Sequence, residues 1–390
     1  MRVLYANHTS RISGGERALL DLLAGLPGSV RALVACPRGP LAQAVGALGI
    51  PVAAVAEADA SLRLDPWHTP RGIAQLLRAG LALRRLSRRY GAQLIHANSI
   101  RTGLMAVVSA RLGGPPVVVN LHDCLPPTRI TNMVKHILSS DASVLIANSH
   151  YTAASFASPT SSTTPVTIYN PFDLGRFNPG LVDRNEARTK LGMRTTTLAL
   201  GVIAQITPWK GQADAIRCAA LLRQTSPDLR LLLVGDVKFS SKATRYDNRA
   251  YARSLRALVE DLNLQDTVQF LGEREDVPQV MRALDIVLVP SWEEPFGRTV
   301  IEAMAMETPV VATEVGGPSE VITNGVDGVL LPPQQPQRWA AAVGDLLANP
   351  SRRAEMGRRG RATVAKSFSR EAHVARVLDA YQGLLSFHLN

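Results

Sequence analysis

The sequence predicts an α/β protein made of two Rossmann-like β/α/β domains, each built on a parallel sheet. Short apolar runs alternate with amphipathic segments of helical period along almost the whole chain. Runs such as VVVN (117–120) and IVLV (286–289) show no polar alternation, as expected of strands buried on both faces. The 390 residues are enough for two ordinary domains.

The first domain is predicted to span residues 1–180. Residues 2–6 form its first strand, and a loop then leads through Gly14-Gly15 into a helix over 16–26 with leucines at helical spacing. Further strands are predicted at 31–37, 50–55, 92–98 and 115–123, helices at 41–49, 71–91 and 101–113, a strand–loop–helix unit at 143–157, and a last strand that runs into a proline-containing linker over 166–177.

The second domain is predicted to span residues 181–370, and a terminal helix (371–390) is predicted to pack back on the first domain. Its predicted strands lie at 197–206, 229–236, 268–273 and 286–291, with helices at 249–264, 276–285 and 298–306 and a loop and helix over 207–225. The chain ends in helices at 336–347, 351–367 and 369–387. Two sheets of this type are expected to face each other across a cleft.

Composition narrows the class of protein. No apolar run approaches the ~18 residues that a membrane span needs, and the start MRVLYAN is typical of a strand rather than of a signal sequence. The three cysteines are scattered without CxxC spacing, which favours a reducing compartment and argues against a disulfide framework or a zinc site. We therefore expect a cytoplasmic protein.

The net charge of +11 is concentrated in the first half. Residues 1–180 hold 17 lysines and arginines against 8 acidic residues, whereas residues 181–390 hold 26 against 24. Such a field attracts nucleic acid, anionic lipid or a phosphorylated substrate.

A basic amphipathic helix is predicted over 71–91, with Arg71, Arg78, Arg85 and Arg89 near one another at helical spacing. Two interpretations are open: arginine stems that cover a core, or a patch that binds an anionic membrane or a phosphorylated acceptor. The second would make the protein peripheral at the inner membrane face. The stretch lacks interleaved aromatic residues, which argues against nucleic acid.

The stretch 290–320 carries the strongest chemical signal. Glu294 precedes a predicted helix that starts after Gly297, and Glu302 is expected roughly two turns below Glu294, on the order of 10 Å along the axis. Between them the helix start at Arg298-Thr299-Val300 offers unpaired N–H groups and a positive dipole end. A carboxylate, an anion site and a second carboxylate suit a sugar nucleotide, with hydroxyls at both ends and phosphate between them.

Two features of the first domain point the same way. Gly14-Gly15 stands at a predicted strand-to-helix turn. Either the backbone there approaches a ligand closely, or the glycines only permit a tight turn without a ligand. His122 follows the carboxyl end of a predicted strand, where open α/β sheets bind ligands, although a histidine with purely structural contacts is the alternative.

The Glu-x7-Glu spacing around Phe296-Gly297, with GGPSE downstream (316–320), resembles the signature of retaining glycosyltransferases of family 4 and the GT-B fold. The resemblance implies a metal-independent enzyme without a cofactor, in which Lys210 of a Lys-Gly turn grips the donor diphosphate. It also implies that Glu302 binds the nucleotide ribose, and that Glu294 and His122 lie near the donor sugar. The amides of Phe296 and Gly297 would bind sugar hydroxyls, and Gly14-Gly15 would close on the donor from the other domain.

The sequence departs from that family at Gln205, five residues before Lys210, where an arginine is usual. Glutamine can donate a hydrogen bond but carries no charge, so Arg298 or an N-terminal arginine would have to compensate.

The sequence thus predicts a retaining hexosyltransferase that uses a nucleotide-sugar donor. The acceptor would be a hydroxyl of a lipid-linked or polysaccharide intermediate or of a secondary metabolite. The alternative is a non-catalytic sugar- or lipid-binding homologue, which Gln205 favours.

Overall fold

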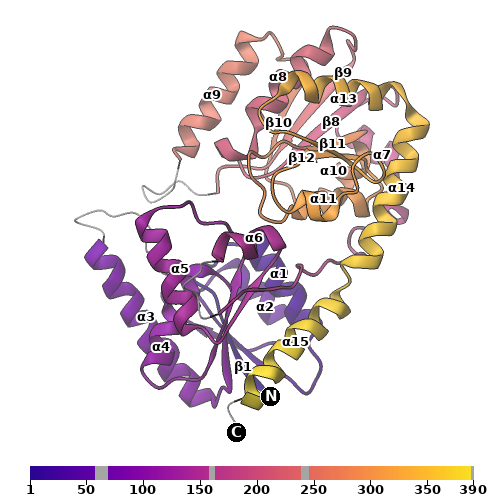
Figure 1. Cartoon of the computed structure of the whole chain (residues 1–390). Helices are drawn as coiled ribbons and strands as arrows, with labels where there is room; N and C mark the ends of the chain where they lie inside the picture. The colour runs from indigo at the N-terminus through magenta and orange to yellow at the C-terminus, as the bar shows by residue number, and fades with distance from the viewer. Residues whose placement is uncertain (58–68, 158–162, 239–245, 388–390) are drawn as a thin grey trace. The chain divides into compact units, whose positions relative to one another are not determined.

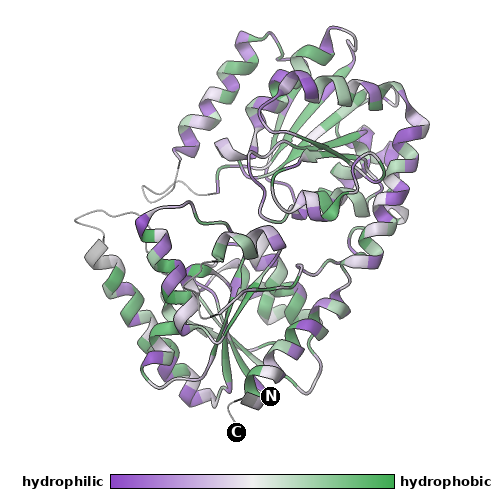
Figure 2. Cartoon of the chain, in the orientation of Figure 1, coloured by the Kyte–Doolittle hydropathy of each residue, from purple (hydrophilic) through white to green (hydrophobic). Residues whose placement is uncertain are grey.

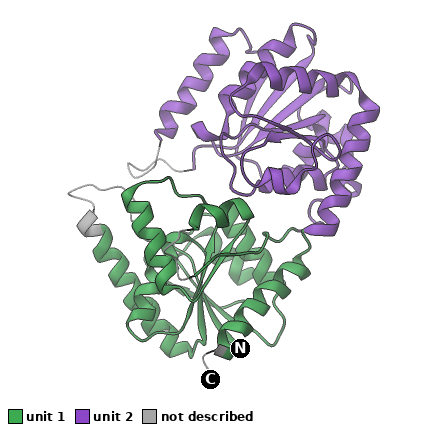
Figure 3. Ribbon diagram, in the orientation of Figure 1, with its two compact units in different colours: residues 1–172, 368–390 green, residues 173–367 purple. Residues whose placement is uncertain are grey.

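A computed structural model describes residues 1–57, 69–157, 163–238 and 246–387, and the chain divides into two compact units (Figures 1 and 3). Unit 1 comprises Met1–Phe172 and Phe368–Asn390, and unit 2 comprises Asp173–Ser367. The sequence placed these boundaries a few residues later, at 180 and 370. The chain passes from unit 1 to unit 2 after Phe172 and returns to unit 1 at Phe368. At these boundaries the Phe172 amide donates a hydrogen bond to the Phe368 carbonyl at 3.2 Å.

Unit 1 contains a parallel sheet of strand order β3-β2-β1-β4-β5-β6-β7 in its described residues. Its strands are β1 (Arg2–Ala6), β2 (Arg31–Cys36), β3 (Val52–Ala54), β4 (Leu94–Ala97), β5 (Val117–Leu121), β6 (Val144–Ala147) and β7 (Val166–Thr167). Its helices are α1 (Gly14–Ala24), α2 (Pro40–Ala47), α3 (Thr69–Tyr90), α4 (Ile100–Arg111), α5 (Arg129–Asp141), α6 (His150–Phe156) and α15 (Arg370–Phe387).

Unit 2 repeats this topology with the order β10-β9-β8-β11-β12-β13 in the described residues. Its strands are β8 (Leu198–Ile203), β9 (Leu229–Val234), β10 (Val268–Gly272), β11 (Ile286–Val289), β12 (Val310–Thr313) and β13 (Val329–Leu331). Its helices are α7 (Arg184–Lys190), α8 (Gln212–Arg223), α9 (Asn248–Asp261), α10 (Val277–Ala283), α11 (Arg298–Ala305), α12 (Pro318–Val321), α13 (Pro336–Ala348) and α14 (Pro350–Ser367), and short 3₁₀ turns lie at Pro179–Leu181 and Pro208–Lys210.

Both strand orders reverse direction at one point, between β1 and β4 in unit 1 and between β8 and β11 in unit 2. In open α/β sheets ligands bind beyond the carboxyl ends of the strands at this point. The prediction of two Rossmann-like domains with parallel sheets is confirmed, and each domain has one position where a ligand is expected.

The sheets are buried because their strands are apolar on both faces. Figure 2 shows the strands of both units in green, and β5, β11 and β12 are buried along their whole length. In unit 1 one apolar cluster includes residues of β1, β2, α1 and α15, and a second includes β4, β5 and α4. Uninterrupted apolar strands therefore require helices on both sides of each sheet.

Helix α5 was missing from the sequence prediction. Its Val134 and Leu138 are buried at a spacing of four residues, and Thr128 caps its start by accepting a hydrogen bond from the Thr131 amide at 3.3 Å. The capping pair was a signal in the sequence, but the polar residues of this segment diluted its apolar pattern.

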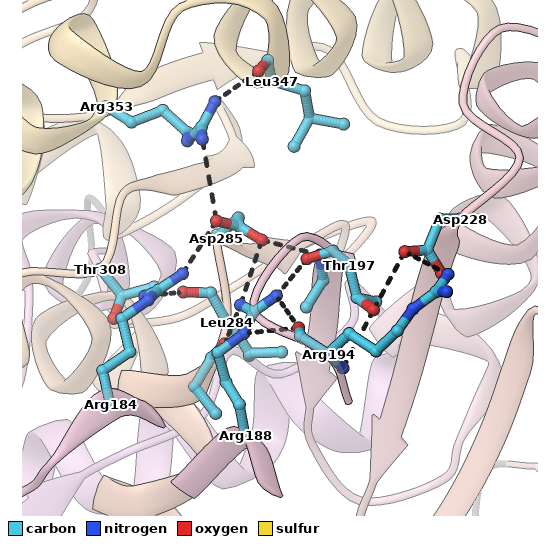
Figure 4. Close-up of polar contacts among 12 residues, drawn as sticks. Arg184, Arg188, Arg194, Thr197, Asp228, Leu284, Asp285, Thr308, Leu347 and Arg353 are labelled. Atoms are coloured by element: carbon cyan, nitrogen blue, oxygen red, sulfur yellow. Dashed lines mark hydrogen bonds and ion pairs between the residues drawn. The ribbon is translucent and has the colours of Figure 1, made fainter. Parts of the chain in front are cut away.

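Asp285, just before β11, anchors two helices of unit 2 to the amino-terminal end of its sheet (Figure 4). Its carboxylate pairs with Arg184 at 2.8 Å, with Arg188 at 3.5 Å and with Arg353 of α14 at 3.8 Å, and it accepts the Ala199 amide at 2.8 Å. Burial lowers the pKa of Arg184 from its usual value. This cluster lies at the opposite end of the strands from the ligand position, so its role is structural.

Helix α15 is fixed to the sheet of unit 1 through two buried histidines. Tyr381 Oη lies 2.6 Å from His96 Nδ1, and Tyr169 carbonyl oxygen lies 2.7 Å from His373 Nδ1. Burial lowers the pKa of His96 to about 3 and that of His373 to about 4, from an ordinary value of 6.5. Both imidazoles are therefore neutral in the folded chain at pH 5.

This burial predicts acid sensitivity. Below pH 6.5 the unfolded chain binds protons at both histidines and the folded chain does not, so the free energy of unfolding falls as the pH falls from 6.5 toward 4. The expected slope is about 1.4 kcal/mol per pH unit for each histidine. Urea unfolding between pH 6.5 and 5 should show a shallower slope in His373→Gln than in the parent chain. The exposed His136, changed to Gln, serves as control, and an unchanged slope in His373→Gln would contradict the account.

Candidate functional site

Lys210 and Glu294 meet at the ligand position of unit 2. Lys210 ends the 3₁₀ turn after β8, and Glu294 lies in the loop after β11, the neighbouring strand. The distance from Lys210 Nζ to Glu294 Oε2 is 2.5 Å. Both residues line a small hollow at the ends of these strands. Two residues 84 positions apart are thus brought together by the strand order.

The pair is shielded from water and supported on both sides. The side chains of Lys210 and Glu294 are 16% and 10% exposed. Ser291 Oγ donates a hydrogen bond to the same carboxylate oxygen at 2.9 Å, and the ammonium nitrogen lies 4.0 Å from the centre of the Trp209 ring. An ammonium held against a carboxylate and an aromatic face is fixed in position, as binding a ligand anion requires.

The turn that presents Lys210 depends on Gly211. Its φ of +70° is left-handed, and a Cβ on this residue would lie 1.9 Å from the carbonyl oxygen of Pro290, at the end of β11. A side chain therefore cannot fit at this position without moving one of the two loops. The Lys-Gly dipeptide places the lysine over the neighbouring strand.

Helix α11 begins at Arg298, as predicted, and its start lies beside the same strand ends. Gly297 before it adopts a left-handed φ of 88°, and Thr299 Oγ1 donates a hydrogen bond to the Ile203 carbonyl at the end of β8. The Val300 amide donates to the Gly297 carbonyl at 2.9 Å. The sequence predicted that the Val300 amide would bind a ligand. In the structure this amide has an acceptor within the chain. The start of α11 still places a positive dipole end beside the strand ends.

Each carboxylate of the Glu-x7-Glu spacing has a basic partner. Glu302 Oε1 accepts from Arg298 Nε at 3.1 Å, one helical turn before it, and Glu302 is only 9% exposed. Glu302 is therefore not a solvated helix residue. With the Lys210–Glu294 contact, the described site contains two nearly buried ion pairs beside the start of one helix.

The GGPSE loop holds Glu294 in place through the backbone. Gly316 pairs with Glu294 in an isolated parallel bridge, and the Gly317 amide donates to the Glu294 carbonyl at 2.8 Å. The Glu320 amide donates to the Gly317 carbonyl at 2.9 Å, and Phe296 is 4% exposed beneath the loop. The loop therefore supports the position of the first carboxylate.

Gln205 lies in the loop after β8 and is partly buried. Its backbone carbonyl accepts a hydrogen bond from Gln212 Nε2 at 2.8 Å. The sequence suggested Arg298 as a replacement for the usual arginine, but Arg298 forms the ion pair with Glu302. Of the positive groups considered from the sequence for unit 2, Lys210 is the one that lines the hollow.

Unit 1 gathers a second polar group where its own sheet reverses. Asn7 follows β1, Asn98 follows β4 and His122 follows β5. Asn98 Nδ2 donates to Asn7 Oδ1 at 3.1 Å and to the Gly15 carbonyl at 3.2 Å, while Asn98 Oδ1 lies 3.3 Å from His122 Nε2. Asn7 in turn donates to the carboxylate of Glu16 at 3.2 Å. A chain of hydrogen bonds thus runs from a buried carboxylate to the imidazole.

The glycine pair belongs to the same group. Helix α1 begins at Gly14 rather than after the pair, because Ser13 and Glu16 form a capping box around its start. A Cβ on Gly15 would lie 3.1 Å from His122 Cδ2. The structure therefore brings Gly15 and His122 together in unit 1, and it brings Lys210, Glu294 and the start of α11 together in unit 2.

Sequence reasoning missed several members of both groups. Trp209 and Ser291 adjoin motif residues, so their proximity along the chain was a usable signal. Asn7 directly follows a predicted strand and Asn98 ends another, which is the same signal that identified His122. Glu16 at the third position of a helix after Ser13 is a capping pattern that the sequence displays.

The hydrogen bonds of Asn98 predict which nitrogen of neutral His122 carries the proton. A backbone carbonyl can only accept, so the Gly15 carbonyl fixes the amide orientation of Asn98 and leaves Oδ1 facing the imidazole. Neutral His122 should therefore carry its proton on Nε2. Nitrogen-15 NMR of histidine-labelled protein, with His122→Gln to assign the signal, should show this tautomer, and Asn98→Ala should give a mixture. A proton on Nδ1 in the parent chain would contradict the assignment.

Two families match the chain, one over each unit. The family described as glycosyl transferases group 1 matches residues 183–363, and glycosyltransferase family 4 matches residues 12–176. Among solved structures, Anabaena Alr3699/HepE in complex with UDP-glucose is 26% identical, with a TM-score of 0.83 over 98% of this chain and all of that chain. Sucrose-phosphate synthase from Thermosynechococcus elongatus is 21% identical with a TM-score of 0.79 over 99% of each chain, and supports the fold alone.

Curated relatives agree with these matches. The D-inositol 3-phosphate glycosyltransferase of Pseudarthrobacter chlorophenolicus is 31% identical over 76% of this chain and 72% of that protein. That of Segniliparus rotundus is 35% identical over 55% of this chain. The match covers 45% of that relative, so this chain spans about half of its length. The chain therefore belongs to glycosyltransferase family 4 and is a glycosyltransferase of the GT-B fold.

Proposed function

We propose that the protein transfers a hexosyl group from a UDP-sugar to an acceptor hydroxyl, with retention at the anomeric carbon and without a metal ion. The observation that carries the proposal is the contact of Lys210 with Glu294 beside the start of α11. The similar Anabaena protein, whose structure contains UDP-glucose, supports a UDP-sugar as the donor.

The diphosphate of the donor leaves as an anion, and positive groups must stabilise it. Lys210 Nζ and the amides at the tip of α11 supply a full charge and a dipole end at one place. Gln205, after β8, can add a neutral hydrogen bond. These groups replace the cation that other glycosyltransferases hold with paired aspartates.

The two carboxylates have separate roles in this proposal. Glu294, with Ser291 fixing one of its oxygens, accepts hydrogen bonds from hydroxyls of the donor sugar, together with the amides of Phe296 and Gly297. Glu302, oriented by Arg298, accepts from the ribose. The role of His122 beside the donor sugar stays a prediction from the family resemblance.

The transfer step needs no separate base. The acceptor oxygen bonds to the anomeric carbon while the bond to the diphosphate oxygen breaks, and the acceptor proton passes to that departing oxygen on the same face of the sugar. Glu294 and Glu302 belong to one loop-and-helix segment. They are not placed on opposite sides of a sugar, as a two-carboxylate hydrolase with ~5–9 Å between its carboxyls would require.

The acceptor is proposed to be a hydroxyl compound that carries negative charge. The relatives named D-inositol 3-phosphate glycosyltransferase support this class, as does the excess of 17 basic over 8 acidic residues in residues 1–180. Inositol phosphate and a lipid-linked intermediate that contains phosphate fit the class, as do polysaccharide intermediates and secondary metabolites that carry an acidic group.

Lys210→Ala tests the proposal. UDP-, GDP- and ADP-sugars are first screened by thermal shift, since a ligand of the native state raises its apparent stability. Slow hydrolysis of the donor that binds is then measured in EDTA. The parent chain should hydrolyse it, and Lys210→Ala should lose about 100-fold or more, as when an anion-stabilising group is removed.

Lys190→Ala is the matched control, because it removes another ion-paired lysine of unit 2, paired with Glu186 at 2.6 Å and exposed. Full hydrolysis in Lys210→Ala with its circular dichroism unchanged would contradict the role of Lys210. Hydrolysis lost in EDTA and restored by Mg²⁺ or Mn²⁺ would contradict the metal-free step.

A further inference from the structure

Helix α3 (Thr69–Tyr90) has one face that packs on unit 1 and one that does not. Gly80, Leu83 and Ser87 are buried toward the sheet and α4. A Cβ on Gly80 would lie 2.6 Å from Val108 of α4, so the two helices approach closely. These contacts explain one face of the helix and leave the rest of its surface to be explained.

A second stripe, about a quarter of the way round the helix from the buried face at 100° per residue, carries large aliphatic side chains. Ile73, Leu77 and Leu81 follow one another at intervals of four residues and are 54%, 49% and 38% exposed. Ile73 and Leu77 have the helical spacing of an apolar face, and the structure leaves both exposed. Charged residues normally occupy such positions, so a stripe of three exposed aliphatic residues needs a partner.

Arginines flank this stripe. Arg78, Arg85, Arg88 and Arg89 are exposed, and among the residues that the structure describes none of them forms an ion pair. At 100° per residue they lie within the same half of the helix surface as the aliphatic stripe. Residues 69–90 contain no aspartate or glutamate. The side chain of Arg71, also predicted for this patch, lies outside the described residues.

The charge pattern decides between occupants. A second copy of the chain meeting the first through the same face would bring two sets of unpaired arginines together, which is unfavourable. An anionic lipid surface complements the arginines and accepts the aliphatic side chains at the level of its headgroups. Figure 2 shows green and purple residues mixed along α3, as in an interfacial helix. No helix in the described part of the chain is both long and apolar enough to span a bilayer.

We propose that α3 is a membrane-docking surface: Ile73, Leu77 and Leu81 insert among lipid headgroups and the four arginines bind anionic lipid. The proposal rests on the exposed face of α3 and is independent of the donor site. It favours a lipid-linked acceptor within the proposed function, because docking would hold unit 1 at the surface where such an acceptor resides.

The test is flotation of the full chain with vesicles of phosphatidylcholine, alone or with 30% phosphatidylglycerol. Binding should require the anionic lipid and weaken in high salt. Arg78→Gln/Arg85→Gln/Arg89→Gln should lower partitioning about 100-fold, since each arginine near an anionic surface contributes about fivefold. Leu77→Ser/Leu81→Ser should lower it at least about tenfold at constant charge.

Matched controls keep the change in charge and in apolar surface the same. Arg352→Gln/Arg358→Gln/Arg359→Gln removes three exposed arginines of α14 in unit 2, and Leu181→Ser/Leu262→Ser removes two leucines that are 75% and 37% exposed. Both controls should bind like the parent chain, and all variants should hydrolyse the donor at the parental rate.

Three results would overturn the proposal. One is no binding to anionic vesicles at low salt. Another is an equal loss of binding in the control variants, which would assign binding to net charge alone. The third is a dimer in sedimentation velocity that Leu77→Ser/Leu81→Ser abolishes without anionic vesicles binding, which would assign the face to a second copy. Loss of donor hydrolysis in the parent chain would concern the proposed function and leave this test intact.

Discussion

The contact between Lys210 and Glu294 is the interaction on which the account of this glycosyltransferase depends. Two opposite charges 2.5 Å apart and mostly shielded from water are stable only as a pair. A ligand diphosphate would compete with the carboxylate for the ammonium, and sugar hydroxyls would then satisfy the carboxylate. In the proposed function, the pair keeps both charges compensated until a ligand that carries a diphosphate and sugar hydroxyls binds.

The fold explains why these two residues meet. The strand order of unit 2 makes β8 and β11 neighbours where the sheet reverses, so loops 84 residues apart share one edge. Gly211 allows the first loop to approach the second, and the GGPSE loop fixes Glu294 by backbone bonds. Unit 1 uses the same topology for the group around His122. At the far end of the unit 2 sheet, Asp285 anchors helices instead.

Much of this was predictable from sequence, and the failures have physical causes. The alternation of apolar runs and helical patterns predicted both sheets, and the start of α11 after Gly297 was placed correctly. Helix α5 was missed because its polar residues obscured its period. The exposure of Ile73 and Leu77 could not be predicted, because periodicity identifies an apolar face and does not tell whether anything covers it. Pairings such as Arg298 with Glu302 depend on side-chain geometry, which spacing alone leaves open.

The most direct test is of whether Lys210 is shared between Glu294 and the ligand diphosphate. Isothermal titration would measure the affinities for UDP and for the UDP-sugar in the parent chain, Lys210→Met and Glu294→Gln. Lys210→Met should weaken both ligands. Glu294→Gln should bind UDP at least as tightly as the parent, because the ammonium loses its competitor, and should lose the extra affinity that the sugar provides. Unchanged UDP affinity in Lys210→Met would contradict the account.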